Sequence, residues 1–541
     1  MGYPQKEGGE ESQSIVVEQL EENTVSQDRL VLSWWKLQLL NLCLCISLFL
    51  STVEITVVST AVVPISDALH GFSKSPWTIN AYLVAYGGVL VITAKLSDIF
   101  GRRSTTCVCL VIFAITSIAC GVSQTIDQLI VFRALQGVGG GGIYTMVFVI
   151  LPEMCTPAQY PLYVTIVSSV FALSNLLGPI LGGVISDRST WRWIFFLNVP
   201  ITAVAIILLF FAIPSHFPYA RPRRTVGFSV AALKRLDIPG TFLILACSTL
   251  FITAIQEGGM GHAWSSALVL GTLISSVCLW GALLWWSRYQ ATHPSKREPT
   301  LPWRILTNRV AMGVLMEAFW VGALLYTAIV LLPQRFQVVN GTTPLTAGYR
   351  LLPLTLTAPV GSLIGGYLMQ NMHQPPLYVL LGGAIIQTLG AGLLVSLPSN
   401  TLEFAKAGYG YQAITGIGLG ITSATVVMCA VIVFEERDIP VGMGAIGQFR
   451  TFGGSIGISV CSNVLNRSML SKLKSQLSLA QISSLQVSAG SINEFPATLQ
   501  RVVRLCYAEG FKRQMICLTA FGAVSIVTLL LMLERRPRRQ H

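Results

Sequence analysis

The chain has 541 residues, of which 52% are hydrophobic and 11% charged, with a mean hydropathy of +0.64 and a net charge of +12. Soluble domains carry about 25% charged residues, so this composition excludes an ordinary soluble enzyme and indicates a polytopic membrane protein. The positive charge does not indicate nucleic-acid binding, because the basic residues fall in short clusters between apolar runs. The twelve cysteines are scattered and show neither zinc-ligand spacing nor a disulfide framework, so we expect no metal site and no cofactor.

Segment 1–36 is largely polar and acidic and lacks the pattern of a signal peptide, so we expect a disordered cytoplasmic tail. Apolar length then predicts about fourteen membrane-spanning segments. The first eight lie near 38–64, 76–97, 104–123, 127–150, 162–186, 194–213, 238–258 and 266–287. The other six lie near 309–333, 345–369, 376–397, 407–433, 440–465 and 513–533.

These segments predict a six-helix bundle over 37–213, a central pair within 214–308, a second six-helix bundle over 309–533 and a basic cytoplasmic tail over 534–541. With the N-terminus in the cytoplasm, the strongly basic loops after segments two, six and eight all face inward, as positively charged loops do. The same topology places the acceptor sequences at Asn340 (NGT) and Asn466 (NRS) in or beside outer loops, so both are candidate glycosylation sites.

Five stretches follow one another in an order that is typical of one family. They are VEITVVSTA (53–61), AKLSDIFGRR (94–103), RALQGVG (133–139), LGPILGG (177–183) and WRWIFFLNVP (191–200). Together they resemble the motifs of the major facilitator superfamily, and within it the fourteen-helix drug–proton antiporters, above all fungal toxin and multidrug exporters. Two positions depart from the pattern: Glu54 stands where that group usually has aspartate, and Ala94 stands where the loop motif usually begins with glycine.

Glu54 is the main candidate for proton coupling, with Arg133 as its counter-charge. A carboxylate inside a membrane segment is costly and points to function, and loss of water favours its neutral form, so Glu54 could take up and release a proton. A carboxylate that lines a wet cavity or bonds to a neighbouring helix without coupling is the alternative, and for Arg133 the alternative is an anchor for helix packing. We expect Glu54 to lie about 10 Å deeper than Arg133, which leaves direct and water-bridged contact both open.

The loop AKLSDIFGRR supplies Lys95, Asp98, Gly101, Arg102 and Arg103 as candidate gating residues. Asp98 and Arg102 stand four apart, which suits a local ion pair. The resemblance implies that the loop clamps the two halves together in the outward-open state. The run GVGGGG (137–142) matches a dinucleotide-binding pattern, but it lies inside one apolar helix and instead predicts close helix approach.

The pair Gly178–Pro179 predicts a kink in the fifth helix, and Gly182 and Gly183 allow a tight crossing. A hinge or seal for alternating access and plain helix packing are both open. Candidate cavity residues are Gln136, Glu317, Trp320, Gln448 and Arg450; ordinary packing is the alternative for the tryptophan.

The sequence therefore predicts an all-α major facilitator fold and a proton-coupled antiporter that exports small hydrophobic organic molecules by alternating access. The alternative on the same fold is a siderophore, amino-acid or sugar carrier working as symporter or facilitator. An ATP-driven enzyme is not expected, because the chain lacks the GxxxxGK[ST] phosphate-binding loop. We expect a monomer whose partners are its substrate, protons and the bilayer, in the plasma membrane rather than the vacuolar membrane.

Overall fold

The computed structural model describes residues 32–156, 159–214, 217, 237–258, 262–293, 299–372, 374–435, 438–473 and 476–534. Every regular element in these ranges is a helix. The two predicted tails lie almost wholly outside the described residues, as do most of the basic loop after the sixth span and part of the basic loop after the eighth.

The first half of the fold contains six spans, the last of them formed by two consecutive helices. Its elements are α2 (Trp34–Ala68), η1 (Phe72–Lys74), α3 (Ser75–Phe100), α4 (Arg102–Val122), α5 (Ile126–Met154), α6 (Tyr160–Arg188), α7 (Trp193–Phe196) and α8 (Asn198–Ala212). The central pair consists of α10 (Ile238–Glu257) and α11 (Ala267–Thr292).

The second half has more short helices between its long ones. Its elements are α12 (Trp303–Thr307), α13 (Arg309–Val338), α14 (Pro344–Arg350), α15 (Leu352–Gln370), α16 (Pro376–Val395), α17 (Ala407–Val433), α18 (Ile439–Leu473), α19 (Leu479–Val487), η3 (Ala489–Glu494), α20 (Ala497–Thr528) and η4 (Leu529–Met532).

Thirteen helical segments of the described chain are long and apolar enough to cross a membrane, close to the expected number of about fourteen. The other predicted span corresponds to α18, a 35-residue helix that packs along both α13 and α3 but is less apolar. Its lower hydropathy follows from residues such as Gln448 and Arg450 and from its glycines, because these positions face other helices rather than lipid.

The stretch 467–512, between the last two predicted spans, is largely helical. Those residues form the end of α18, then α19, η3 and the first turns of α20, which begins sixteen residues before the expected start at 513. These turns bury an apolar cluster of their own that includes Met469, Leu473, Val503 and Tyr507. A search for apolar length finds bilayer spans and misses such short amphipathic helices, since their apolar residues lie on one face only.

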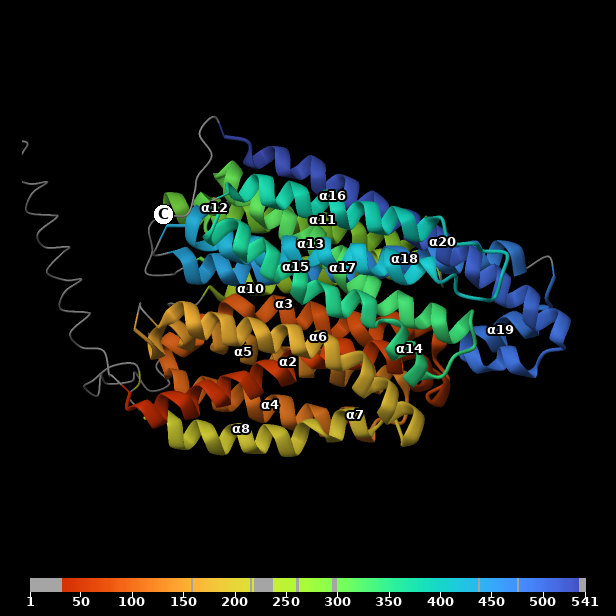
Figure 1. The fold of residues 1–541 in the computed structure, drawn as a ribbon, viewed down its shortest axis with the longest axis horizontal. Coiled ribbons are helices and arrows are strands. Elements are labelled where there is room, and N and C mark those ends of the chain that lie inside the picture. Colours follow the sequence, from red (N-terminus) through yellow and green to blue (C-terminus); the bar gives the residue numbers. More distant parts are fainter. Residues whose placement is uncertain are drawn as a thin grey trace, which may run out of the picture.

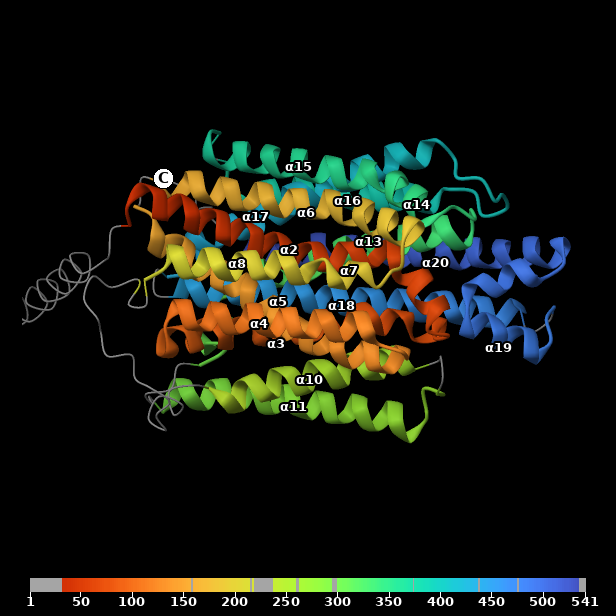
Figure 2. The ribbon, with the colours of Figure 1, turned by 90° about the horizontal axis from the view of Figure 1, so that it is seen from below.

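The two halves lie side by side, with the first-half helices below and the second-half helices above in Figure 1. Helices α3 and α18 pack against each other across this seam, where Asn80 donates to Ser459 Oγ at 2.8 Å. The pair α10–α11 is central in the sequence but lies at one edge of the molecule in Figure 2. Of the two, α10 contacts both α3 and α18, so the pair covers the seam from outside.

Glycines set the spacing within the first half. A Cβ on Gly137 would lie 2.4 Å from the carbonyl oxygen of Tyr82, and one on Gly141 would lie 2.4 Å from that of Tyr86. Helices α3 and α5 therefore touch backbone to backbone, as predicted for the glycine run. This close approach brings Arg133 of α5 within reach of Glu54 on α2.

We predict that Gly137→Ala lowers the thermal stability of the purified protein in detergent, because overpacking of a tight contact costs about 1–3 kcal/mol. Gly281→Ala is the matched control, since nothing lies within 4 Å of the Cβ it would add to α11. Alanine favours a helix over glycine by about 1 kcal/mol, so the control should be neutral or stabilising. Equal melting temperatures for the two variants, followed by intrinsic fluorescence, would contradict the close contact.

Candidate functional site

Glu54 lies on α2 in the interior of the first half, and its side chain has 0% exposure. One carboxylate oxygen accepts a hydrogen bond from Arg133 Nη1 at 2.5 Å. The other accepts from the side-chain amide of Asn198 at 2.7 Å. Each oxygen of the buried carboxylate thus has a donor, and one of the donors is a full positive charge.

Arg133 pairs directly with Glu54, and the structure explains how the two side chains meet. Ser51 Oγ donates to the carbonyl of Gly140 at 2.8 Å, which fixes the register of α2 against the antiparallel α5. Glu54 lies three residues after Ser51 on α2, and Arg133 lies seven residues before Gly140 on α5, toward the same end of the bundle. Along the helix axis the two residues are therefore offset by about 6 Å, at 1.5 Å per residue. The expected offset of about 10 Å was too large, and an arginine side chain spans the smaller gap.

The guanidinium of Arg133 is held on several sides. Its Nε donates to the carbonyl of Thr78 at 2.9 Å, and Nη1 also donates to Gln136 Oε1 at 2.8 Å. The ring centroids of Tyr82 and Phe195 lie 4.4 and 5.8 Å from the guanidinium carbon. Arg133 therefore joins α2, α3, α5 and the α7–α8 region around one charge.

Asn198 is the residue of this site that the sequence reasoning did not assign. It is the first residue of α8 and is buried, with its amide turned toward Glu54. It stands inside the stretch WRWIFFLNVP, which was quoted for its resemblance alone. Gln136, a predicted cavity residue, also belongs here, since it contacts Arg133 and donates to Ser117 Oγ at 2.8 Å.

The loop motif forms a second polar cluster at the end of the first half where α3 meets α4. Arg102 pairs with Asp98 at 2.5 Å, as the four-residue spacing predicted, and with Glu153 of α5 at 2.6 Å. Gly101 lies between α3 and α4 with φ of 89°, a left-handed conformation that favours glycine. Arg103 lies over the ring of Phe210, and Lys95 lies on the last turns of α3.

The contacts that the structure shows for Asp98, Arg102 and Arg103 all lie within the first half. They tie the α3–α4 turn to the ends of α5 and α8. A clamp between the two halves, which the resemblance implies, stays a prediction. Glu153, the more buried partner of Arg102, was not predicted.

The Gly-Pro stretch lies in α6, where Pro179 stands inside a continuous helix. A Cβ on Gly178 would lie 1.9 Å from Thr56 Oγ1, and one on Gly182 would lie 2.1 Å from the carbonyl of Val57. Gly183 faces the second half instead, since a Cβ on it would lie 2.7 Å from the carbonyl oxygen of Pro344. These glycines therefore pack α6 both against the helix that carries Glu54 and against α14 across the seam.

The predicted cavity residues of the second half do not form one cluster. Glu317 is buried on α13 and accepts from Ser525 of α20 at 2.8 Å. Trp320 packs its ring against Phe319 and Phe521 within the same half, which fits the packing alternative. Gln448 is buried on α18. Arg450 of the same helix reaches across the seam and donates to the hydroxyl of Tyr144 on α5 at 3.2 Å.

The two glycosylation candidates differ in their surroundings. Asn340 follows α13, and its amide donates to the carbonyl of Leu402 at 2.7 Å. Asn466 lies inside α18 rather than in or beside a loop, because that helix continues to Leu473. Use of either site for glycosylation stays a prediction.

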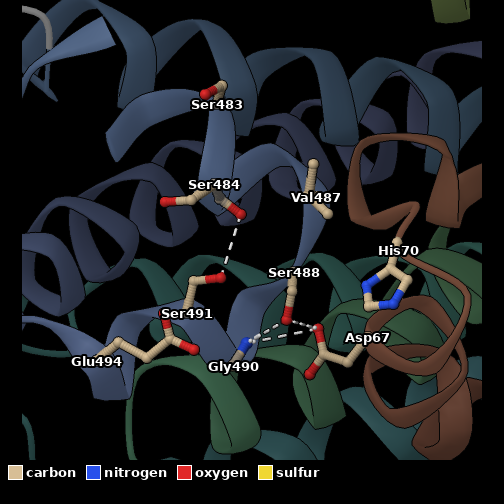
Figure 3. Close-up of a pocket in the computed structure, with 9 residues that line it drawn as sticks. All are labelled: Asp67, His70, Ser483, Ser484, Val487, Ser488, Gly490, Ser491 and Glu494. Carbon is tan, nitrogen blue, oxygen red and sulfur yellow. Dashed lines mark hydrogen bonds between the residues drawn. The ribbon is translucent and has the colours of Figure 1, made fainter. Parts of the chain in front are cut away.

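A pocket of about 590 Å³ lies where α2 ends against α19 and η3. Figure 3 shows Asp67 at its edge, accepting from Ser488 Oγ at 2.8 Å and from the amide of Gly490. His70 lines the same pocket. This pocket lies among the short outer helices, while Glu54 lies in the helix core, so we assign it no part in the buried ion-pair site.

The family model described as Major Facilitator Superfamily matches residues 44–256. The chain is 40% identical over 533 residues to the MFS-type transporter FPY5 of Fusarium mangiferae, covering 98% of this chain and 89% of that protein. It is 30% identical over 502 residues to the efflux pump dotC of Dothistroma septosporum, covering 91% and 83%.

A solved structure shares the fold at low sequence identity. It is a bacterial homologue of the human lysosomal transporter Spinster in an inward-facing, unoccupied conformation, with a TM-score of 0.62, 15% identity, and coverage of 92% of this chain and 97% of that one. The helix order, the coverage and the identities agree: this chain belongs to the major facilitator superfamily and is a transporter rather than an enzyme.

Proposed function

We propose that this protein is a proton-coupled antiporter that exports small hydrophobic organic molecules, with Glu54 as the group that carries the proton. The observation that carries the proposal is the fully buried carboxylate of Glu54, held between Arg133 and Asn198. Relatives named as efflux pumps support the direction of transport. Export from the cell favours the plasma membrane, and the fold provides a complete pair of halves in one chain, which supports a monomer.

The ion pair gives protonation a structural consequence. While Glu54 is ionised, it balances Arg133, and the closed site carries no net charge from this pair. A proton on Glu54 leaves the guanidinium unbalanced in an apolar interior, which is costly. Protonation therefore favours a conformation in which water reaches Arg133, and loss of the proton favours closure.

The helices around the pair can transmit this change. Thr56, half a turn beyond Glu54, donates to the carbonyl of Ser174 on α6 at 3.2 Å, and Thr60 donates to that of Pro179 at 3.1 Å. The carbonyl of Thr60 in turn accepts from Gln337 of the second half at 2.9 Å. A shift of α2 thus reaches both α6 and the opposite half, in line with a hinge or seal at Gly178–Pro179.

We predict that Glu54→Gln abolishes uptake of a hydrophobic dye driven by an imposed pH gradient in inverted membrane vesicles. Glutamine fills the same space but cannot carry the proton. Glu317→Gln is the matched control, a buried carboxylate of the second half bonded to Ser525, and it should retain driven uptake. Driven uptake that survives Glu54→Gln and is lost in Glu317→Gln would move the coupling site to the second half.

Folding needs a separate check, because an unpaired buried charge costs about 3–5 kcal/mol. The double variant Glu54→Leu with Arg133→Met removes both charges and should recover most of the stability that Glu54→Gln loses. It should still lack pH-driven uptake. Recovery of driven uptake in the double variant would show that neither residue carries the proton.

The loop cluster gives a prediction on gating. Arg102 is 11% exposed and Glu153 17%, whereas Asp98 is 51% exposed. Exposed pairs contribute about 0–1 kcal/mol, while hydrogen bonds to buried charges contribute about 1.5–3 kcal/mol. We therefore expect Glu153→Gln to lower the melting temperature and the transport rate more than Asp98→Asn does. The reverse order would make the exposed aspartate the main partner of Arg102.

A further inference from the structure

Arg450 is a second-half side chain that points into the first half. It lies on α18, is 7% exposed, and donates through Nη2 to the hydroxyl of Tyr144 at 3.2 Å. Its guanidinium carbon lies 5.2 Å from the ring centroid of Phe171 on α6. A Cβ on Gly322 would lie 1.9 Å from the carbonyl of Arg450, so α13 holds this turn of α18 in place from behind.

This buried cation has no carboxylate partner among the described residues. Glu317, the fully buried carboxylate of the same half, accepts its hydrogen bond from the hydroxyl of Ser525. The Nε of Arg450 is buried and makes no hydrogen bond within the described part of the chain. Burial of an unbalanced charge is costly and marks a functional position. Arg133, by contrast, lies 2.5 Å from the carboxylate of Glu54.

Aromatic rings enclose the guanidinium. Tyr144 and Phe171 come from the first half. Tyr326 of the second half packs against α18 one turn beyond Arg450, since a Cβ on Gly454 would lie 2.3 Å from its ring. Tyr86 lies next to Tyr144, with ring centroids 5.8 Å apart. Apolar rings around one convergent charged group are the usual composition of a site for a small organic molecule.

We propose that Arg450 binds the acidic group of the transported molecule, so that the substrates are hydrophobic or aromatic organic acids, carboxylates above all. The planar guanidinium matches a carboxylate with two parallel hydrogen bonds, and the free Nε supplies a donor for such a pair. The rings of Tyr86, Tyr144, Tyr326 and Phe171 would pack against the apolar body. This inference rests on the proposed export function and names its substrate class.

The same rings connect this site with the ion pair. Arg133 lies over Tyr82, whose ring centroid is 5.6 Å from that of Tyr86, and Tyr86 is 5.8 Å from Tyr144, which bonds Arg450. One packed row of tyrosines therefore joins the proton site of the first half to the anion site at the seam. A molecule that separates Arg450 from Tyr144 displaces a ring in this row.

The test compares organic acids with their neutral amides on the purified full-length protein. The probes are 2-naphthoate, 1-naphthaleneacetate and 1-pyrenebutyrate at pH 7.5, each paired with its primary amide, and binding is measured by equilibrium dialysis. We expect at least one acid to bind about tenfold more tightly than its amide, since a hydrogen-bonded charge pair contributes that much. Arg450→Gln should reduce this ratio to about one.

Arg335→Gln is the matched control. Arg335 is another buried arginine of the second half, over the rings of Phe404 and Phe511 and away from Tyr144, so its loss should leave the acid preference intact. Arg450→Lys keeps the charge without the planar fork and should give an intermediate ratio. This second variant tests the proposal even where Arg450→Gln does not yield a monodisperse protein.

Acids and amides that bind alike to the intact protein would overturn the inference, as would a preference that survives Arg450→Gln or the absence of binding by every acid. Failure of the export proposal is separate. If pH-driven uptake of neutral or cationic dyes depends on Glu54 while no acid binds, the antiporter stands and Arg450 is structural. If acids bind through Arg450 but no pH gradient drives uptake, the anion site stands and proton coupling fails.

Discussion

The buried ion pair between Glu54 and Arg133 is the constraint on which the rest of the first half depends. Two opposite charges inside a membrane domain are tolerated only at short distance and with further hydrogen bonds to the charged groups. Four helical regions meet this condition together: α2 brings the carboxylate, α5 the guanidinium, α3 the carbonyl of Thr78, and α8 the amide of Asn198. Small residues in α5 allow these backbones to approach closely enough, since a Cβ on Gly137 or Gly141 would meet the backbone of α3.

The sequence predicted the helices that apolar length can detect and the charges that interrupt them. Glu54 and Arg133 were recognisable because a charge within an uncharged run is rare. Their direct contact was not predictable, because it depends on a register that one hydrogen bond from Ser51 to α5 reports. Asn198 was missed for a related reason, since a buried asparagine has no distinctive pattern until its partner is known.

The second half was predicted less well, and the cause is again physical. The end of α18 and the first turns of α20 pack together in one apolar cluster, so hydropathy alone places these helix ends too far apart in the sequence. Glu317 and Arg450 both stand within apolar segments, but their neighbours differ. Glu317 points into its own half, whereas Arg450 points across the seam. Residue type shows that a buried charge exists, and only the packing shows what it faces.

The two proposed sites together give a simple account of charge during a transport cycle. With an acid on Arg450 and Glu54 ionised, both arginines are balanced, and the loaded, unprotonated protein can close around no net charge. With Glu54 protonated and no substrate bound, both arginines are unbalanced, so the returning form carries two positive charges and its closure costs free energy. An inside-negative membrane potential offsets part of this cost, because moving both charges inward releases up to about 4.6 kcal/mol per 100 mV, twice the value for one charge. Export of one monovalent acid against one entering proton moves the same two charges, so the charge states of the buried groups and the overall exchange agree.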